Sequence, residues 1–89
     1  MSIQKVSIRQ VKAARALLGW SQERLATTSG VSIPTIKRLE AADGALGGRP
    51  ITGEKLRIAL ENGGIEFLDE NGGGRGVRLR KDRSKRRDR

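Results

Sequence analysis

The sequence has no cysteine and no histidine, and its aromatic residues are limited to one Trp and one Phe. Without cysteine there can be no disulfide bridge and no thiolate metal site. Without histidine there is no imidazole to act as a general base or to bind zinc. These absences argue against an enzyme, and we expect no cofactor, no metal and no small-molecule ligand.

Long apolar runs are also missing. Residues 1–9 mix charged and apolar side chains, whereas a signal peptide or a membrane span needs an uninterrupted apolar stretch. We therefore expect a cytoplasmic protein with no membrane partner. At 89 residues the chain has room for one compact domain.

Positive charge is what the sequence has in excess. It carries 19 Lys and Arg against 10 Asp and Glu, for a formal net charge of +9. Nucleic acid, an anionic membrane surface and an acidic protein would all be attracted by such a charge. Residues 81–89 are basic and contain no apolar side chain, so we expect them to form a flexible tail that either contacts phosphates or aids solubility.

The first helix is signalled by a capping box. Ser7 stands three residues before Gln10, and Val11, Ala14 and Leu18 follow at helical spacing. This pattern predicts a helix over residues 8–19.

Two short helices are expected to follow. Ser21 is a candidate N-cap, and Gly30 supplies the left-handed residue on which a helix can end. Ser32 is the next candidate cap, with Pro34 in the first turn, where a missing N–H costs nothing. These signals predict helices over residues 22–29 and 33–42.

The second half of the chain predicts a helix and a hairpin. Residues 43–50 are glycine-rich and are expected to form a loop, after which Thr52 caps a helix that ends at Gly63 and Gly64. Two segments then alternate with a period near two around a turn-rich stretch, which predicts a β-hairpin. The strands are expected at residues 65–68 and 77–80.

The segment from Gln22 to Leu39 has the spacing of a helix-turn-helix. Two helices that cross steeply need a small residue at the crossing and a glycine at the turn. Counted from Gln22, Ala26 is fifth and Gly30 is ninth, as this geometry requires. We expect Val31, Ile36 and Leu39 to face inward.

Gln22, Ala26, Gly30, Ile36 and Leu39 together resemble the signature of the Cro and phage-repressor type of regulators, the XRE family. The resemblance covers about residues 7–62. It implies a mainly α fold, a four- to five-helix lambda-repressor-like DNA-binding domain followed by a C-terminal β-hairpin. It also implies a bacterial, nucleoid-associated regulator of transcription that binds double-stranded DNA as a homodimer. We expect a repressor on a palindromic operator.

This resemblance divides the chain into three parts. Residues 1–64 form the DNA-binding domain, with the helix-turn-helix at 22–39. Residues 65–80 form the hairpin, and 81–89 form the basic tail.

The resemblance also assigns base contacts to the third helix, whose first turn faces the major groove. Arg38 can donate two hydrogen bonds to guanine, and Thr35 offers a hydroxyl and a methyl. Ile33 and Pro34 depart from the polar residues common at these positions, so they favour a thymine methyl. The expected base contacts are Ser32, Ile33, Pro34, Thr35 and Arg38.

Phosphate contacts are expected around the second helix, because a helix N-terminus suits a phosphate oxygen. Ser21 and Gln22 are the candidates there. Lys37, on the flank of the third helix, and Arg49, in the loop before the fourth helix, are further candidates, and each could equally be a solvated surface charge.

Arg15 and Glu40 resemble the pair that joins the first helix to the end of the third in this family. We expect a structural role for them, since removing one partner of a partly buried pair leaves an uncompensated charge.

Phe67, Val77 and Leu79 are the expected dimer interface, because a two-stranded ribbon alone is marginal and leaves an unpaired edge. Two alternatives stay open: these residues cover the fourth helix within one subunit, or that helix, through its Leu56 face, forms the dimer.

Other functions also stay open. An antitoxin-like protein would bind a partner protein as well as its own promoter, and its tail would fold on that partner. An RNA-binding module would favour aromatic residues on the strands, and Phe67 alone is a poor stacking platform.

Overall fold

The computed structural model describes residues 6–42, 50–68 and 73–81. Four helices and a two-stranded antiparallel sheet make up the described part, which confirms the predicted fold class. The elements are α1 (Ile8–Leu18), α2 (Gln22–Ser29), α3 (Ile33–Ala42), α4 (Pro50–Asn62), β1 (Ile65–Leu68) and β2 (Gly76–Leu79). Arg49 and most of the tail, residues 82–89, lie outside the described residues.

The capping signals of the first helix are confirmed. The Ser7 hydroxyl accepts the N–H of Gln10, and the Gln10 side chain accepts the N–H of Ser7 at 2.9 Å. Gly19 adopts a left-handed conformation with φ 70°, so α1 ends at Leu18 and Gly19 is its C-cap, not its last residue as predicted.

The start of α4 corrects the sequence prediction. The helix begins at Pro50, so Thr52 lies inside its first turn and is not its N-cap. Proline suits the first helical position because the N–H that it lacks would have no partner there. The other end is as predicted: the N–H groups of Gly63 and Gly64 donate to carbonyls of the last turn of α4.

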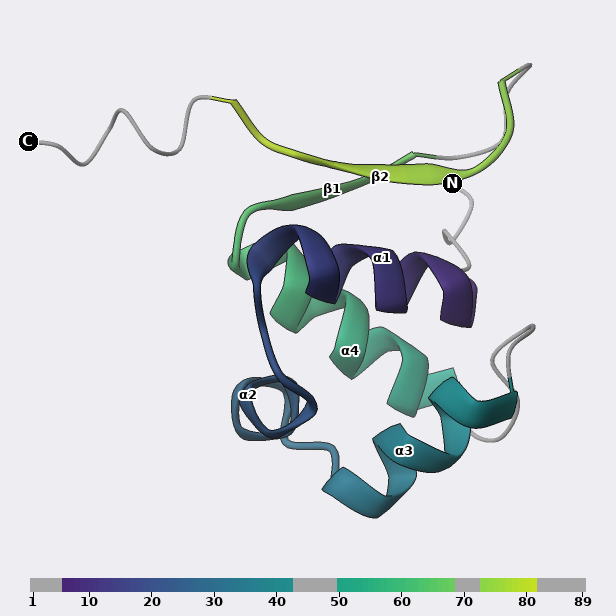
Figure 1. Cartoon of the computed structure of the whole chain (residues 1–89), viewed down its shortest axis with the longest axis vertical. Coiled ribbons are helices and arrows are strands. Elements are labelled where there is room, and N and C mark those ends of the chain that lie inside the picture. The colour runs from purple at the N-terminus through teal and green to yellow at the C-terminus, as the bar shows by residue number, and fades with distance from the viewer. Residues whose placement is uncertain (1–5, 43–49, 69–72, 82–89) are drawn as a thin grey trace, which may run out of the picture.

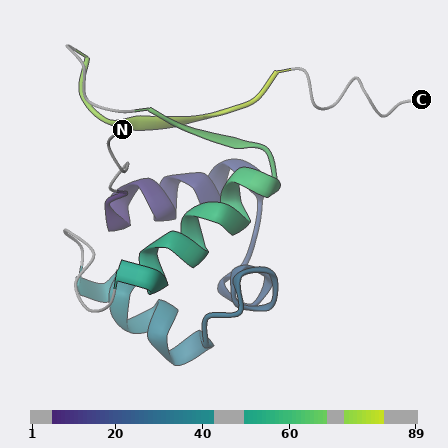
Figure 2. The ribbon, with the colours of Figure 1, turned by 180° about the vertical axis from the view of Figure 1, so that it is seen from behind.

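The hairpin and the helix-turn-helix occupy opposite ends of the molecule. In Figure 1 the hairpin lies above α1, and α2 and α3 lie at the far side of α1 and α4. Figure 2 shows the same order from behind. α2 is seen nearly end-on while α3 runs across the view, so the two helices cross steeply (Figure 1).

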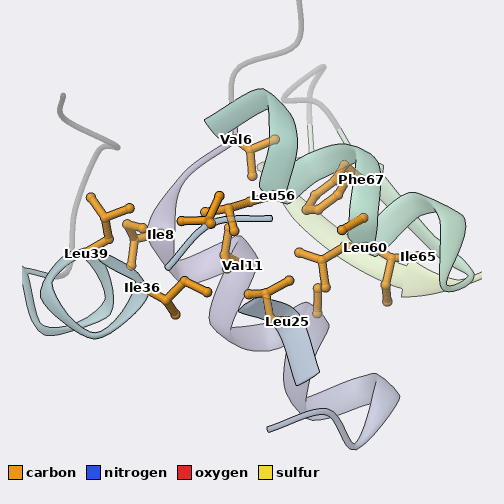
Figure 3. Packing of buried hydrophobic residues seen from close by; sticks show 13 residues of the cluster. Val6, Ile8, Val11, Leu25, Ile36, Leu39, Leu56, Leu60, Ile65 and Phe67 are labelled. Atoms are coloured by element: carbon orange, nitrogen blue, oxygen red, sulfur yellow. The ribbon is translucent and has the colours of Figure 1, made fainter. Parts of the chain in front are cut away.

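One hydrophobic core joins all these elements (Figure 3). Leu25, Ile36 and Leu60 meet there from α2, α3 and α4, and each is almost fully buried. Ile65 and Phe67 of β1 belong to the same cluster, so the hairpin shares the core of the helices. The other members are Val6, Ile8, Val11, Ala14, Val31, Leu39, Leu56 and Ala59.

The register of the hairpin decides which side chains face the helices. Phe67 pairs with Val77 and Ile65 pairs with Leu79, so these four share one face of the hairpin. Ile65, Phe67 and Val77 pack against the helical core, whereas Leu79 stays exposed. β2 begins at Gly76, paired with Leu68, one residue earlier than predicted. The prediction placed Arg80 in the strand; it follows the strand, although its N–H still donates to the carbonyl of Gly64 at 2.8 Å.

Gln10 of α1 binds the hairpin where β1 ends and β2 begins. Its side chain is buried, and its amide nitrogen donates to the carbonyl of Gly76 at 2.9 Å and reaches that of Leu68 at 3.5 Å. The same side chain therefore completes the capping box of α1 and satisfies backbone acceptors of both strands.

Candidate nucleic-acid interface

The turn between α2 and α3 is built from local hydrogen bonds. The Ser21 hydroxyl accepts the N–H of Arg24 at 2.9 Å and so caps α2. Gly30 adopts φ 82°, a left-handed conformation that permits the sharp exit from the helix. The Ser29 hydroxyl accepts the N–H of Val31 at 3.1 Å, which holds the turn before α3 begins.

α3 has a buried side and an exposed side. Ile36, Leu39 and Glu40 are buried, whereas the side chains on the opposite face of the helix reach solvent. Of the predicted base contacts, Ile33 and Thr35 are half-buried on the two flanks of this face. Ser32, Pro34 and Arg38 are exposed. The predicted base contacts thus lie together along one accessible surface of α3, from Ser32 just before the helix to Arg38 near its middle.

The first turn of α3 is organised by two hydroxyl groups. The Ser32 hydroxyl accepts the N–H of Thr35 at 3.3 Å, which fits its predicted role as a cap. The same hydroxyl donates to the Thr35 hydroxyl at 2.9 Å.

Two cations on α3 have no partner among the described residues. Lys37 and Arg38 are exposed, and neither makes a hydrogen bond or an ion pair within the part of the chain that the structure describes. When no protein carboxylate pairs with a cation, an external anion does not have to compete for that cation. The exposed face of α3 can therefore bind an anionic ligand without first breaking a salt bridge.

Arg15 and Glu40 lie together as a bidentate pair. The Nε and Nη2 atoms of Arg15 donate to the two carboxylate oxygens of Glu40 at 2.9 and 2.7 Å. The Nη1 atom of Arg15 donates to the carbonyl of Trp20 at 2.8 Å, which holds the segment between α1 and α2. Burial raises the pKa of Glu40, but the hydrogen bonds from Arg15 and Gln22 and the positive charges of Arg15 and Lys12 together outweigh burial and hold that pKa below its ordinary value.

Gln22 has a role that the sequence analysis missed. Its amide nitrogen donates to Glu40 at 2.9 Å, so the residue predicted to contact phosphate also belongs to the network around Glu40. This bond sets the N-terminus of α2 beside the second half of α3. No spacing rule pairs residues 18 apart in two crossing helices, so only the resemblance to the family could have suggested it.

Trp20 and Arg24 form a second contact that was not predicted. The guanidinium carbon of Arg24 lies 5.0 Å from the centre of the Trp20 ring, a cation–π contact. Their separation by four residues next to a helix start is the signal that could have indicated it.

The residues predicted for the dimer interface lie far from α3, at the hairpin (Figure 1). Phe67 is buried in the core of its own subunit and Val77 is half-buried. Leu79 is 47% exposed, so it is the member of this set with most apolar surface to offer a partner.

The described residues offer neither a metal site nor a membrane-spanning helix. They contain no group of three or more acidic side chains that could hold a metal ion. None of their helices is both long enough and apolar enough to cross a membrane.

Comparison with known proteins agrees with the fold and with the steep crossing of α2 and α3. A family model described as helix-turn-helix matches residues 11–66, more than half of the chain. The chain therefore belongs to the helix-turn-helix family of DNA-binding transcriptional regulators of the Cro and phage-repressor type. A search of curated proteins found no match to it. A DNA-binding regulator fold of this kind is not that of an enzyme family.

Proposed function

We propose that the protein is a dimeric repressor that reads a palindromic operator with α3. The observation that carries this proposal is the exposed face of α3, where Arg38 has no partner in the described part of the chain and the buried residues lie on the opposite side. An exposed second helix of a helix-turn-helix enters the major groove with its first turn toward the base edges.

Base reading is assigned to five residues. Arg38 donates to guanine O6 and N7, and the Thr35 hydroxyl contacts a neighbouring base. Ile33 and Pro34 contact thymine methyl groups, and Ser32 lies at the edge of the same surface.

Phosphate contacts orient the helix-turn-helix on the duplex. Ser21 and Gln22 stand at the N-terminus of α2, where free N–H groups attract an anion. Lys37 is exposed on the flank of α3 and contacts the backbone of the same groove. Arg49, outside the described residues, is proposed as a further phosphate contact.

The dimer is proposed because a single reading helix covers only about four or five base pairs, and two helices about one DNA turn apart double the site. The hairpin is the proposed interface: β2 is an edge strand whose outer backbone groups suit pairing with a second copy. Leu56 is buried, so a dimer through α4 would have to use Ile51 and Ile58, which are exposed. A dimer on its operator represses because it occupies DNA that the transcription machinery needs.

Selection of bound duplexes from a random pool tests this function. The expected result is an inverted repeat whose half-sites lie about 10 base pairs apart, centre to centre. Failure to enrich any sequence over random DNA would overturn the regulator proposal.

Arg38→Ala sharpens the same test. It is expected to cost about 1 to 3 kcal/mol of binding free energy and to relax base preference at one position of each half-site. Lys55→Ala is the matched control, because Lys55 is an exposed cation on α4 outside the proposed interface. An equal effect of the two variants would contradict the assignment of Arg38.

A further inference from the structure

The exposed side of α3 carries hydrogen-bond donors and almost no acceptors. Residues 33–42 contain no Asn, Gln or Asp, and their single acid, Glu40, is buried with both oxygens bonded. Lys37 and Arg38 can only donate. Among the described residues 32–42, the hydroxyls of Ser32 and Thr35 are therefore the only accessible side-chain groups that can accept a hydrogen bond.

The hydrogen bonds of these hydroxyls take up one of the two lone pairs on each oxygen. Ser32 accepts the N–H of Thr35 and donates its own proton to the Thr35 oxygen. A hydroxyl that accepts a hydrogen bond becomes a stronger donor, so the two bonds support this direction. The proton of Thr35 is then the group that still needs a partner. Leaving it unpaired when DNA excludes water costs more than leaving a lone pair unfilled.

We propose that α3 reads base edges through their acceptors only, and that Ser32 is a positioning residue that sets Thr35 as a donor. Guanine O6 and N7, thymine O4 and adenine N7 are readable by such a surface, whereas the amino groups of adenine and cytosine are not. The proposal rests on the proposed function and adds the chemical class of its target: a half-site of acceptor edges with thymine methyl groups beside them.

A comparison of the wild type with Thr35→Val finds the base pair that Thr35 reads. Valine keeps the shape and the methyl of threonine and replaces the hydroxyl with a second methyl, so base preference is expected to be lost at one position per half-site. Thr35→Ser, which keeps the hydroxyl, is expected to retain that preference. An unchanged preference in Thr35→Val would overturn the proposal.

Binding to DNA that carries base analogues at that position then shows whether Thr35 contacts an acceptor or an amino group. Removing purine N7 or weakening thymine O4, whichever is contacted, is expected to reduce wild-type affinity about tenfold. Removing the amino group of the same base pair is expected to change it less than about twofold. Thr35→Val is the control for effects of the analogues on the DNA structure itself. Its affinity is expected to change with neither analogue. Sensitivity of the wild type to the amino group alone would overturn the proposal.

Ser32→Ala tests the positioning role. It frees the Thr35 oxygen, so that position is expected to tolerate amino-bearing edges, with its discrimination reduced from about tenfold to about twofold. Ser7→Ala removes the equivalent N-cap from α1, away from α3, and is expected to leave the selected sequence unchanged. Equal effects of the two variants would contradict a role for Ser32 beyond capping.

These results are distinguishable from failure of the proposed function. If no duplex is enriched, the protein is not a sequence-specific regulator. If a half-site is enriched and Thr35 reads an adenine or cytosine amino group in it, the regulator stands and the inference about acceptors falls.

Discussion

Glu40 is held by side chains from two other helices. Arg15 of α1 and Gln22 of α2 both donate to its carboxylate on α3, and Lys12 of α1 donates to its carbonyl at 3.3 Å. Only 8% of the Glu40 side chain is exposed, so water cannot replace these partners freely. This one carboxylate therefore helps to set the mutual orientation of three helices.

Removing Arg15 should destabilise the protein because it leaves Glu40 charged and largely buried. Arg15→Ala is expected to lower the free energy of unfolding in urea by about 3 kcal/mol. Arg57→Ala is the matched control: Arg57 has the same 21% exposure, but its partners Glu54 and Glu61 are more open to water. The control is expected to lose less than about 1 kcal/mol. Similar losses would show that burial of Glu40 is not the cause.

The stability that Glu40 contributes should disappear in acid. Its pKa is lower in the folded state than in the unfolded state, so the unfolded state takes up the proton first as pH falls. The contribution is complete above the ordinary pKa of about 4.3 and is lost as pH falls through the folded value. The difference in unfolding free energy between wild type and Glu40→Gln, measured in urea from about pH 7 to about pH 3, is therefore expected to shrink below about pH 4. A difference that grows in acid would contradict this assignment.

Among the elements, the contact between α4 and the start of α2 depends on a missing side chain. Gly63 follows α4, and a Cβ atom there would lie 2.8 Å from the Trp20 ring. Trp20 is packed against the core, and Arg24 of α2 covers its ring. Because Gly63 has no side chain, the Trp20 ring can pack between the end of α4 and the first turn of α2.

Gly63→Ala is expected to displace Trp20 and to cost about 1 to 3 kcal/mol of unfolding free energy. Trp20 is the only Trp in the chain and there is no Tyr, so its emission reports on this place alone. The spectrum is expected to shift to the red as the ring gains contact with water. Gly73→Ala is the control, because a Cβ there would meet nothing within 4 Å. An unshifted spectrum in Gly63→Ala would argue against the close contact.

The helix-turn-helix and the hairpin lie at two separate ends of the molecule. α2 and α3 form one end and the hairpin forms the other, with α1 and α4 between them (Figure 2). Because Ile65 and Phe67 lie in the shared core, the hairpin is fixed relative to α3. A dimer through β2 would therefore hold two copies of α3 at a defined spacing.

Leu79→Glu is expected to weaken dimerisation at least about tenfold, since it would place a charge in the proposed contact. Sedimentation at a series of concentrations measures the shift toward monomer. Ile58→Glu on α4 is the matched control, with 45% exposure against 47% for Leu79. If Ile58→Glu dissociates the protein and Leu79→Glu does not, α4 forms the interface instead.

The helix bounds predicted from the sequence are correct where they depend on residues close together in the chain. The caps Ser7 and Ser21 and the left-handed Gly30 act within a few residues, and α1, α2 and α3 lie within one residue of their predicted bounds. The prediction failed at the start of α4, where Thr52 and Pro50 both carry helix-start signals and the structure uses the proline.

Periodicity, caps and turn residues by themselves determined the helices, the hairpin and the helix-turn-helix, because each depends on contacts between near neighbours in the chain. Only the tertiary structure decided that Gln22 binds Glu40, that Phe67 is buried while Leu79 is exposed, and that Gly63 receives Trp20. These contacts join residues far apart in sequence, and they depend on how the helices cross and where the hairpin lies. No local pattern carries that information.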